Sequence, residues 1–423
     1  MTRHALLVAA LLVAAASLAA PPHPSLPSAT VPNGLGVNIH FTDPRPGEME
    51  MLAASGVRWV RMDFTWSATE RQRGQYDFSA YDRLLAALEA HQLHALLILD
   101  YGNELYEPAG AVATEEGRAA FAKWAAAAAT RFQGRGVLWE IWNEPNIPNF
   151  WKPQPDVDKY TALALATSRA IRDAAPGEAI IGPATSGVDL KFLEGCFRAG
   201  LLDYWDAVSV HPYRQTPPET ALADYDNLRR LITQYAPEDK HIPILSGEWG
   251  YSSGWENFDD ARQGRLLPRQ WLVNFSAGIP LSIWYDWHDD GPDPHEPEHH
   301  FGTVAHEYRE GQSPVYEPKP AYLAAKTLTA TLGGFQFEKR LPLENADDFA
   351  LVFRRGEEVR FAVWTASAEP HEVAVPTGEG RFTAIRHTGM QARSIIPAQG
   401  GHVQLTIRDA PVYLVPIPAD AAD

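Results

Sequence analysis

Two glutamates, Glu144 and Glu248, each stand at the end of a strongly apolar run that predicts a buried strand. Glu144 follows "LWEIWN" and precedes Pro145, and Glu248 ends "IPILSGE". Runs that are apolar almost throughout are typical of strands covered on both faces. Pro145 ends the first run because the residue before a proline is pushed away from regular helical continuation. A pair of carboxylates across a small site suits glycosidic hydrolysis, in which one protonates the leaving oxygen and the other attacks the sugar or activates water.

Eight strand-like runs alternate with longer runs that have the apolar spacing of amphipathic helices. The strand candidates lie at residues 34–40, 57–64, 94–100, 137–143, 179–184, 205–211, 242–248 and 279–286. The helix candidates lie at residues 82–92, 115–132, 158–177, 225–239 and 319–334. This alternation predicts an α/β fold, a (β/α)8 TIM barrel over residues 33–335. The fourth and seventh strands would then bring both glutamates to the C-terminal face of the barrel.

The two ends of the chain have a different composition from the barrel segment. Residues 1–20 have the order of a signal peptide, with Arg3 before an apolar run and small residues after it, and residues 21–32 form a Pro-rich linker. This order predicts a periplasmic or secreted protein, with no membrane contact after cleavage. Residues 336–423 show short runs near period two broken by Gly-rich turns, which predict an accessory antiparallel β-sandwich.

The overall charge narrows the class of partner. The chain has 36 basic and 53 acidic residues, a net charge of −17, which argues against nucleic acid or an anionic membrane surface. Its 13 Trp, 15 Tyr and 17 Phe residues supply a core and also platforms for flat, weakly polar ligands. We find no phosphate-binding loop and no dinucleotide fingerprint, so the sequence predicts no cofactor. It leaves the oligomeric state open.

Five motifs in order along the barrel resemble those of the clan A glycoside hydrolases. They are "WVRMDFTW" (59–66), "WNEPN" (142–146), "VSVHPY" (208–213), the Glu at the end of the seventh strand, and "SIWYDW" (282–287). The resemblance covers the whole barrel and is strongest to family 39, including its bacterial exopolysaccharide-hydrolase branch.

The resemblance implies a role for each matching residue. Glu144 would be the acid/base and Glu248 the nucleophile of a retaining double displacement on a carbohydrate substrate. Asn143 would bond the sugar 2-hydroxyl, Arg61 would orient Glu248 with His211 and Tyr213 alongside, and Trp284 would form the platform beneath the sugar. Because two carboxylates about 5 Å apart repel each other by roughly 3 kcal/mol at an effective dielectric constant near 20, one of them should hold a proton. Arg61 favours ionisation of Glu248, which leaves Glu144 as the donor.

Other residues have two interpretations each. His40 and Asp63 are expected to bond sugar hydroxyls or to form local ion pairs, and Trp151 to wall a sugar subsite or to pack in the core. The His-rich loop 288–306 is expected to wall the site, with a metal-dependent hydrolase as the alternative. A carbohydrate-binding barrel without turnover is the other alternative. Aromatic residues on several rim loops favour endo-action on a polysaccharide.

Overall fold

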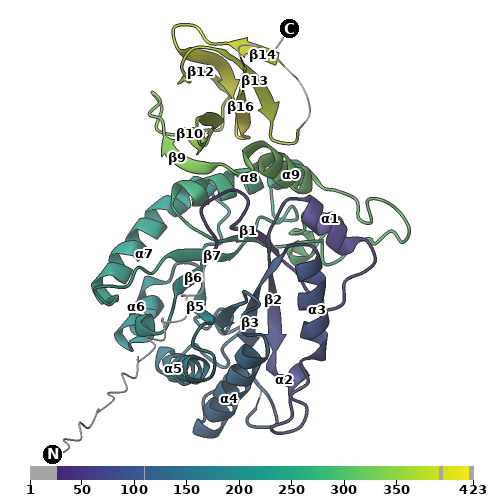
Figure 1. Cartoon of the computed structure of the whole chain (residues 1–423), viewed down its shortest axis with the longest axis vertical. Coiled ribbons are helices and arrows are strands. Elements are labelled where there is room, and N and C mark those ends of the chain that lie inside the picture. Colours follow the sequence, from purple (N-terminus) through teal and green to yellow (C-terminus); the bar gives the residue numbers. More distant parts are fainter. Residues whose placement is uncertain (1–25, 109, 390–393, 419–423) are drawn as a thin grey trace, which may run out of the picture.

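The computed structural model describes residues 26–108, 110–389 and 394–418 (Figure 1). The predicted signal peptide, residues 1–20, and the first part of the predicted linker lie outside the described residues, so both stay predictions. No helix in the described part of the chain is long and apolar enough to cross a membrane.

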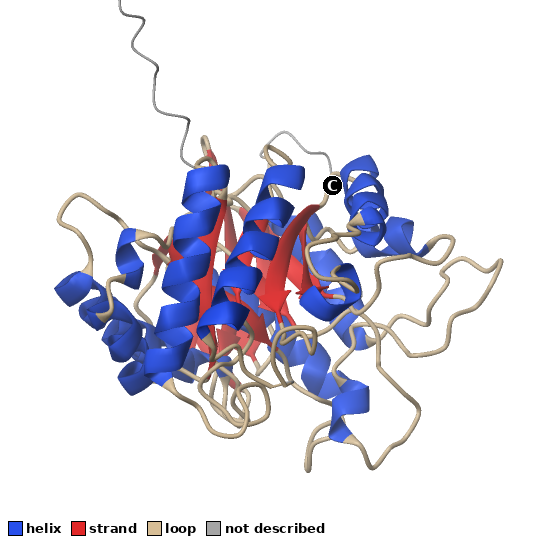
Figure 2. Cartoon of the chain, turned by 90° about the horizontal axis from the view of Figure 1, so that it is seen from below, coloured by secondary structure: helices blue, strands red, loops and turns tan. Residues whose placement is uncertain are grey.

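Eight parallel strands close into a barrel in sequence order, which confirms the predicted fold class. Their bounds are β1 Leu35–Asn38, β2 Trp59–Thr65, β3 His94–Asp100, β4 Leu138–Ile141, β5 Ala179–Ser186, β6 Ala207–His211, β7 Ile244–Trp249 and β8 Ser282–Trp284. Strand β1 closes the ring, since Val37 lies opposite Val60 of β2 and Trp284 of β8. Figure 2 shows helices packed around the outside of these strands.

The helices surround the barrel as α1 Glu48–Ala54, α2 Trp66–Thr69, α3 Ser79–Ala90, α4 Glu115–Arg131, α5 Val157–Ala174, α6 Leu190–Arg198, α7 Ala221–Tyr235, α8 Asp260–Ser276 and α9 Pro320–Leu332. Short 3-10 turns lie at Leu201–Asp203, Pro218–Thr220 and Pro297–His300. The five helices expected from the sequence correspond to α3, α4, α5, α7 and α9. Helices α1, α2, α6 and α8 were not predicted.

The C-terminal segment forms two antiparallel sheets, of order β14-β13-β16-β11-β10-β9 and β12-β15. The strands are β9 Gln336–Arg340, β10 Asp348–Arg355, β11 Glu358–Thr365, β12 His371–Pro376, β13 Arg381–Arg386, β14 Ser394–Pro397, β15 His402–Ile407 and β16 Val412–Ile417. The two sheets share a core that includes Val352, Phe361 and Val403. The other face of the larger sheet packs on the barrel, where Phe353 and Trp364 join the barrel core next to α8 and α9 (Figure 1).

The interior of the barrel changes from apolar to polar along the strands. Ten buried apolar residues, among them Trp59, Leu138 and Ala207, form a separate cluster inside the ring. Side chains two positions further on point to the same face of a strand, and these residues are Arg61, Glu140 and Ser209. The fold therefore places a buried polar layer between an apolar floor and the C-terminal ends of the strands.

Candidate active site

The two glutamates singled out from the sequence face each other at the C-terminal ends of the strands. One carboxylate oxygen of Glu144, one of Glu248 and a ring nitrogen of His211 all lie within 4.8 Å of one another. Carboxyl groups about 5 Å apart suit a covalent, retaining displacement, because the wider spacing of inverting enzymes is needed to admit a water.

A tight backbone turn after β4 aims Glu144 into the site. Glu144 has φ 47° and Trp142 has φ 70°, both in the left-handed region that non-glycine residues rarely adopt. The turn is held where the Glu144 amide donates to the carbonyl oxygen of Ala184 at 2.9 Å. His211 Nδ1 lies 2.9 Å from Glu144 Oε1. The strained turn thus presents a carboxylate whose position is fixed from the backbone and from β6.

Glu248 is held by donors on both of its oxygens. The Tyr213 hydroxyl donates to Oε1 at 2.9 Å, and Arg61 Nη1 donates to Oε2. Burial by itself would raise the pKa of Glu248, but His211, Arg61 and the Tyr213 hydroxyl together outweigh burial and lower it. Glu248 is therefore an anion near neutral pH, as a nucleophile must be.

Arg61 is fully buried and joins most of the predicted site residues. Its Nε donates to Glu140 Oε2 at 2.7 Å, and its Nη2 donates to Asn143 Oδ1 at 2.8 Å and lies 3.3 Å from His211 Nε2. Because Asn143 Oδ1 accepts from Arg61, its amide NH2 remains as the donor for a ligand. Glu140 was not predicted as a site residue. The signal for it was a charged residue inside the apolar run "LWEIWN".

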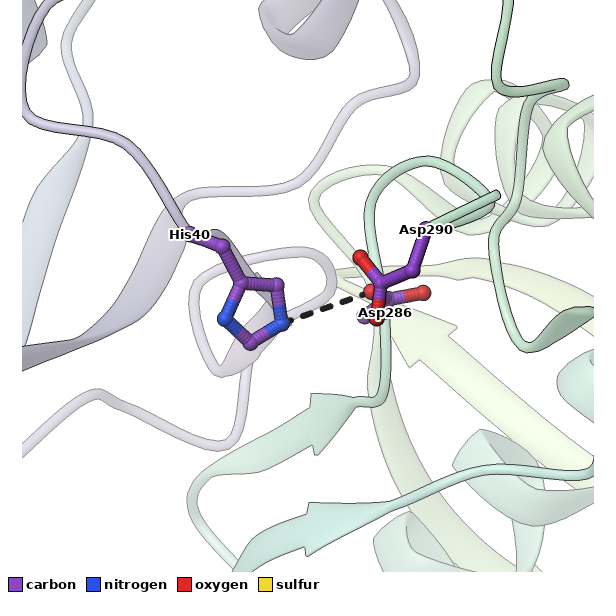
Figure 3. Close-up of side chains that lie close together, drawn as sticks. All are labelled: His40, Asp286 and Asp290. Atoms are coloured by element: carbon purple, nitrogen blue, oxygen red, sulfur yellow. Dashed lines mark ion pairs between the residues drawn. The ribbon is translucent and has the colours of Figure 1, made fainter. Parts of the chain in front are cut away.

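His40 lies beside two aspartates that follow β8 (Figure 3). Its Nε2 lies 3.4 Å from Asp286 Oδ2, and His40, Asp286 and Asp290 each place one ligand atom within 4.8 Å of the others. Burial raises the pKa of Asp286 to about 7. Burial would lower the pKa of His40, but its hydrogen bond to Asp286 and the nearby carboxylates outweigh this and raise it to about 9. The group can bond sugar hydroxyls, and its ligand atoms are close enough to hold a cation.

Two aspartates on neighbouring strands, Asp63 of β2 and Asp100 of β3, also interact. Asp100 of β3 is fully buried, and Asp63 of β2 lies beside it. Burial, followed by the charge and hydrogen bond of Asp63, raises the pKa of Asp100 far above its ordinary value. Burial therefore favours the protonated form of Asp100, and Asp63 forms a local contact with it.

The platform role predicted for Trp284 is wrong, and of the two interpretations of Trp151 the structure supports packing in the core. Trp284 is 0% exposed, with its indole Nε1 donating to the carbonyl of Phe301, and Trp151 is 1% exposed and packs on Trp142. Neither ring has a free face for a ligand. The half-buried ring after β8 is instead that of Tyr285, whose centroid lies 6.4 Å from that of Tyr213.

Three of the five histidines of loop 288–306 lie against backbone carbonyls rather than around a shared centre. His288 Nδ1 and His306 Nδ1 both lie 3.0 Å from the carbonyl oxygen of Asp289, and His300 Nε2 lies 2.8 Å from that of Asp293. Among the residues that the structure describes, none of these histidines belongs to a group of three or more metal-ligating side chains. The histidines of the loop therefore do not support the alternative of a metal-dependent hydrolase.

Comparisons with known proteins agree with this geometry. The family model described as Cellulase (glycosyl hydrolase family 5) matches residues 34–290. A β-xylosidase of Geobacillus stearothermophilus is 31% identical over 139 residues, which make up 28% of this chain and 27% of that protein. The match thus spans about a quarter of the length of that relative.

Solved structures share the fold over nearly the whole chain. A family 39 glycoside hydrolase from Bacteroides cellulosilyticus WH2 has a TM-score of 0.79 and 24% identity, covering 91% of this chain and 81% of that one. A family 39 β-xylosidase from Caulobacter crescentus has a TM-score of 0.65 and 19% identity, covering 94% of this chain and 98% of that one.

Proposed function

Because this chain belongs to the cellulase family (glycosyl hydrolase family 5) of clan A glycoside hydrolases, we propose that it hydrolyses O-glycosidic bonds with retention of configuration. The predicted membership in clan A, with a fold like that of family 39 enzymes, is confirmed. The observation that carries the proposal is the approach of the Glu144 and Glu248 carboxylates to within 4.8 Å.

The proposed reaction has two displacements. Glu248 attacks the anomeric carbon while Glu144 protonates the leaving glycosidic oxygen, so that the bond to the leaving group breaks as the glycosyl ester forms. Esterification removes the negative charge of Glu248, which makes Glu144 easier to ionise. Glu144 then takes a proton from the incoming water, which attacks the anomeric carbon and releases Glu248. Asn143 is positioned to donate its amide to the sugar 2-hydroxyl.

The nucleophile assignment is tested by removing the Glu248 carboxylate. We expect Glu248→Ala to abolish turnover of an aryl glycoside, and added azide to restore part of it with inverted configuration, measured by NMR of the product. Glu104→Ala is the matched control, since Glu104 is an exposed carboxylate after β3, and the side-chain partners of the two glutamates in the described structure are His211, Tyr213 and Arg61. Near-normal turnover by Glu248→Ala contradicts the assignment.

For the substrate, we propose a β-linked xylose-containing glycoside or polysaccharide, cleaved by endo-action. Support comes from the names of the two β-xylosidases, one similar in sequence and one in fold. Half-buried tyrosines flank the glutamates on two sides, with Tyr101 stacked on Phe150 beyond β3 and Tyr285 beyond β8. A panel of glycans with product masses tests both points, because an endo-enzyme releases mixed oligosaccharides and an exo-enzyme releases single sugars. Export to the periplasm or the medium stays a prediction.

A further inference from the structure

One cation serves two glutamates in the buried polar layer. The Arg61 guanidinium lies between Glu140, which accepts from Nε at 2.7 Å, and Glu248, which accepts from Nη1. The side chains of Arg61 and Glu140 are 1% and 0% exposed, so water does not screen either charge. The remaining nitrogen, Nη2, is directed at Asn143. Each guanidinium nitrogen therefore has its own acceptor, and Glu140 holds the edge of the group that faces away from the substrate side.

The second glutamate changes what Arg61 does to the first. With Glu140 present, the group of Arg61, Glu140 and Glu248 carries one net negative charge. Without the charge of Glu140, the whole positive charge of Arg61 would act on Glu248. An anion that is bound more strongly is a weaker base and nucleophile, since the charge that it must give up in the transition state is better stabilised in the ground state.

We propose, on the basis of the proposed function, that Glu140 is a positioning residue for the first displacement. It orients Arg61 so that Nη1 and Nη2 reach Glu248 and Asn143, and it takes up part of the guanidinium charge so that Glu248 keeps its nucleophilicity. Glu140 itself does not touch the substrate.

The sequence around Glu248 also fits this role. Gly247 lies in β7, and a Cβ built there would come within 2.2 Å of Ser209 Oγ and 3.2 Å of Glu140 Oε1. Any larger residue would push against the group that holds Arg61. Among the described residues, neither Glu140 Oε1 nor Ser209 Oγ has a hydrogen-bond partner. The Glu140 carboxylate is therefore not held by a hydrogen bond at Oε1. The bond to Arg61 is the interaction that the carboxylate is placed to make.

The titratable groups that face Glu248 come from several elements. They are Arg61 from β2, His211 and Tyr213 from β6 and its following loop, Glu144 after β4, His40 after β1, Tyr285 after β8, and Glu298 in the 3-10 turn Pro297–His300. Arg61 in turn faces Glu140 and Asp63. A substitution at Glu140 changes the charge that is hydrogen-bonded to Arg61 Nε while leaving every direct neighbour of Glu248 in place.

The test uses Glu140→Gln, which keeps an oxygen acceptor for Arg61 Nε and removes only the charge. We expect kcat/KM on an aryl β-xyloside to fall at least tenfold and the acidic limb of its pH profile to move to lower pH, since Glu248 then becomes more acidic. Glu140→Asp restores the charge and should return the limb toward the wild-type position. Glu178→Gln is the matched control, because Glu178 is also a buried glutamate but bonds Gly134 and Trp139 instead of Arg61.

A readout without turnover separates this proposal from the proposed function. Carbon-13 NMR of the Glu248 carboxyl group, assigned with Glu248→Gln, gives its pKa directly, and Glu140→Gln should lower that pKa. If wild type hydrolyses no glycoside, the proposed function fails, while the NMR titration still decides the role of Glu140. A folded Glu140→Gln variant in which the pKa of Glu248 is unchanged overturns the inference.

Discussion

Tyr213 and Tyr285 lie side by side at the site, yet their hydroxyls bond different glutamates. The Tyr213 hydroxyl donates to Glu248 at 2.9 Å, whereas the Tyr285 hydroxyl donates to Glu298 at 2.8 Å. A hydrogen bond to a charged group contributes about 1.5–3 kcal/mol and favours the ionised form. We therefore expect Tyr213→Phe to raise the pKa of Glu248, move the acidic limb of kcat/KM to higher pH, and lower kcat/KM by roughly tenfold or more.

Tyr285→Phe is the control for that experiment, because it removes a neighbouring hydroxyl that does not touch Glu248. It should leave the acidic limb where it is in wild type, whatever it does to substrate binding. Equal shifts in the two variants would show that the Tyr213 hydroxyl has no specific effect on Glu248. Tyr213→Phe is expected to move the acidic limb in the opposite direction from Glu140→Gln, so the two substitutions check each other.

The His40–Asp286 pair predicts a pH dependence of stability. The pKa of His40 is raised from 6.5 to about 9, so its contribution is fully present below pH 6.5 and is lost as pH rises through 9. Since the His40 side chain is 38% exposed, solvent screening reduces that contribution to about 1 kcal/mol. Urea unfolding of wild type and His40→Gln should differ at pH 6 and converge near pH 10. A constant difference across this range contradicts the assignment.

At the scale of single residues, the sequence predicted which residues would meet but not which way every side chain would face. Arg61, Asn143, Glu144, His211, Tyr213 and Glu248 come together as expected. The predicted role of Trp284 was wrong because strand β8 ends at that residue. Whether a side chain there points inward or outward depends on the backbone geometry after the strand. Glu140 was missed because its partner, Arg61, is 79 residues away in the chain.

At the scale of elements, strands were easier to predict than helices. All eight barrel strands overlap their predicted ranges, since each is a short apolar run that has to be covered on both sides. Helix α8 escaped prediction because Pro268 stands in its interior, where proline normally ends or kinks a helix. Most of α8 is nevertheless buried, from Gln263 to Phe275 apart from partly exposed Arg265. Tertiary packing therefore outweighs the local cost of the proline.

Because α8 carries that cost, its N-terminal cap should matter to stability. The Asp259 side chain accepts from the backbone NH of Arg262 at 2.6 Å. Loss of such a cap costs about 1 kcal/mol. We expect Asp259→Ala to lower the free energy of unfolding in urea by about that amount, and Asp259→Asn, which keeps an acceptor oxygen, to lower it much less. Equal losses in both variants would point to the charge rather than the hydrogen bond.

At the scale of the whole molecule, the β-module contacts the barrel through apolar packing and through a hydrogen bond from Trp364 to a buried ion pair of the barrel. Arg269 of α8 donates to both oxygens of Glu219, at 2.9 and 2.6 Å, and Trp364 Nε1 of β11 donates to Glu219 at 2.7 Å. The Arg269 and Glu219 side chains are 4% and 7% exposed. Sequence periodicity predicted a β-module but could not predict this junction, which brings together residues separated by up to 145 positions.

Removing one partner of a buried pair leaves the other charge without compensation, which typically costs 3–5 kcal/mol. Glu219→Ala should therefore lower the free energy of unfolding by about 3 kcal/mol. Glu338→Ala, which breaks a more exposed pair with Arg354 within the β-module, should change it by less than about 1 kcal/mol. Hydrogen–deuterium exchange should locate the effect, with faster exchange in β11 and α8 and unchanged exchange in β3 on the far side of the barrel. Uniformly faster exchange would mean that the ion pair stabilises the whole chain rather than the junction.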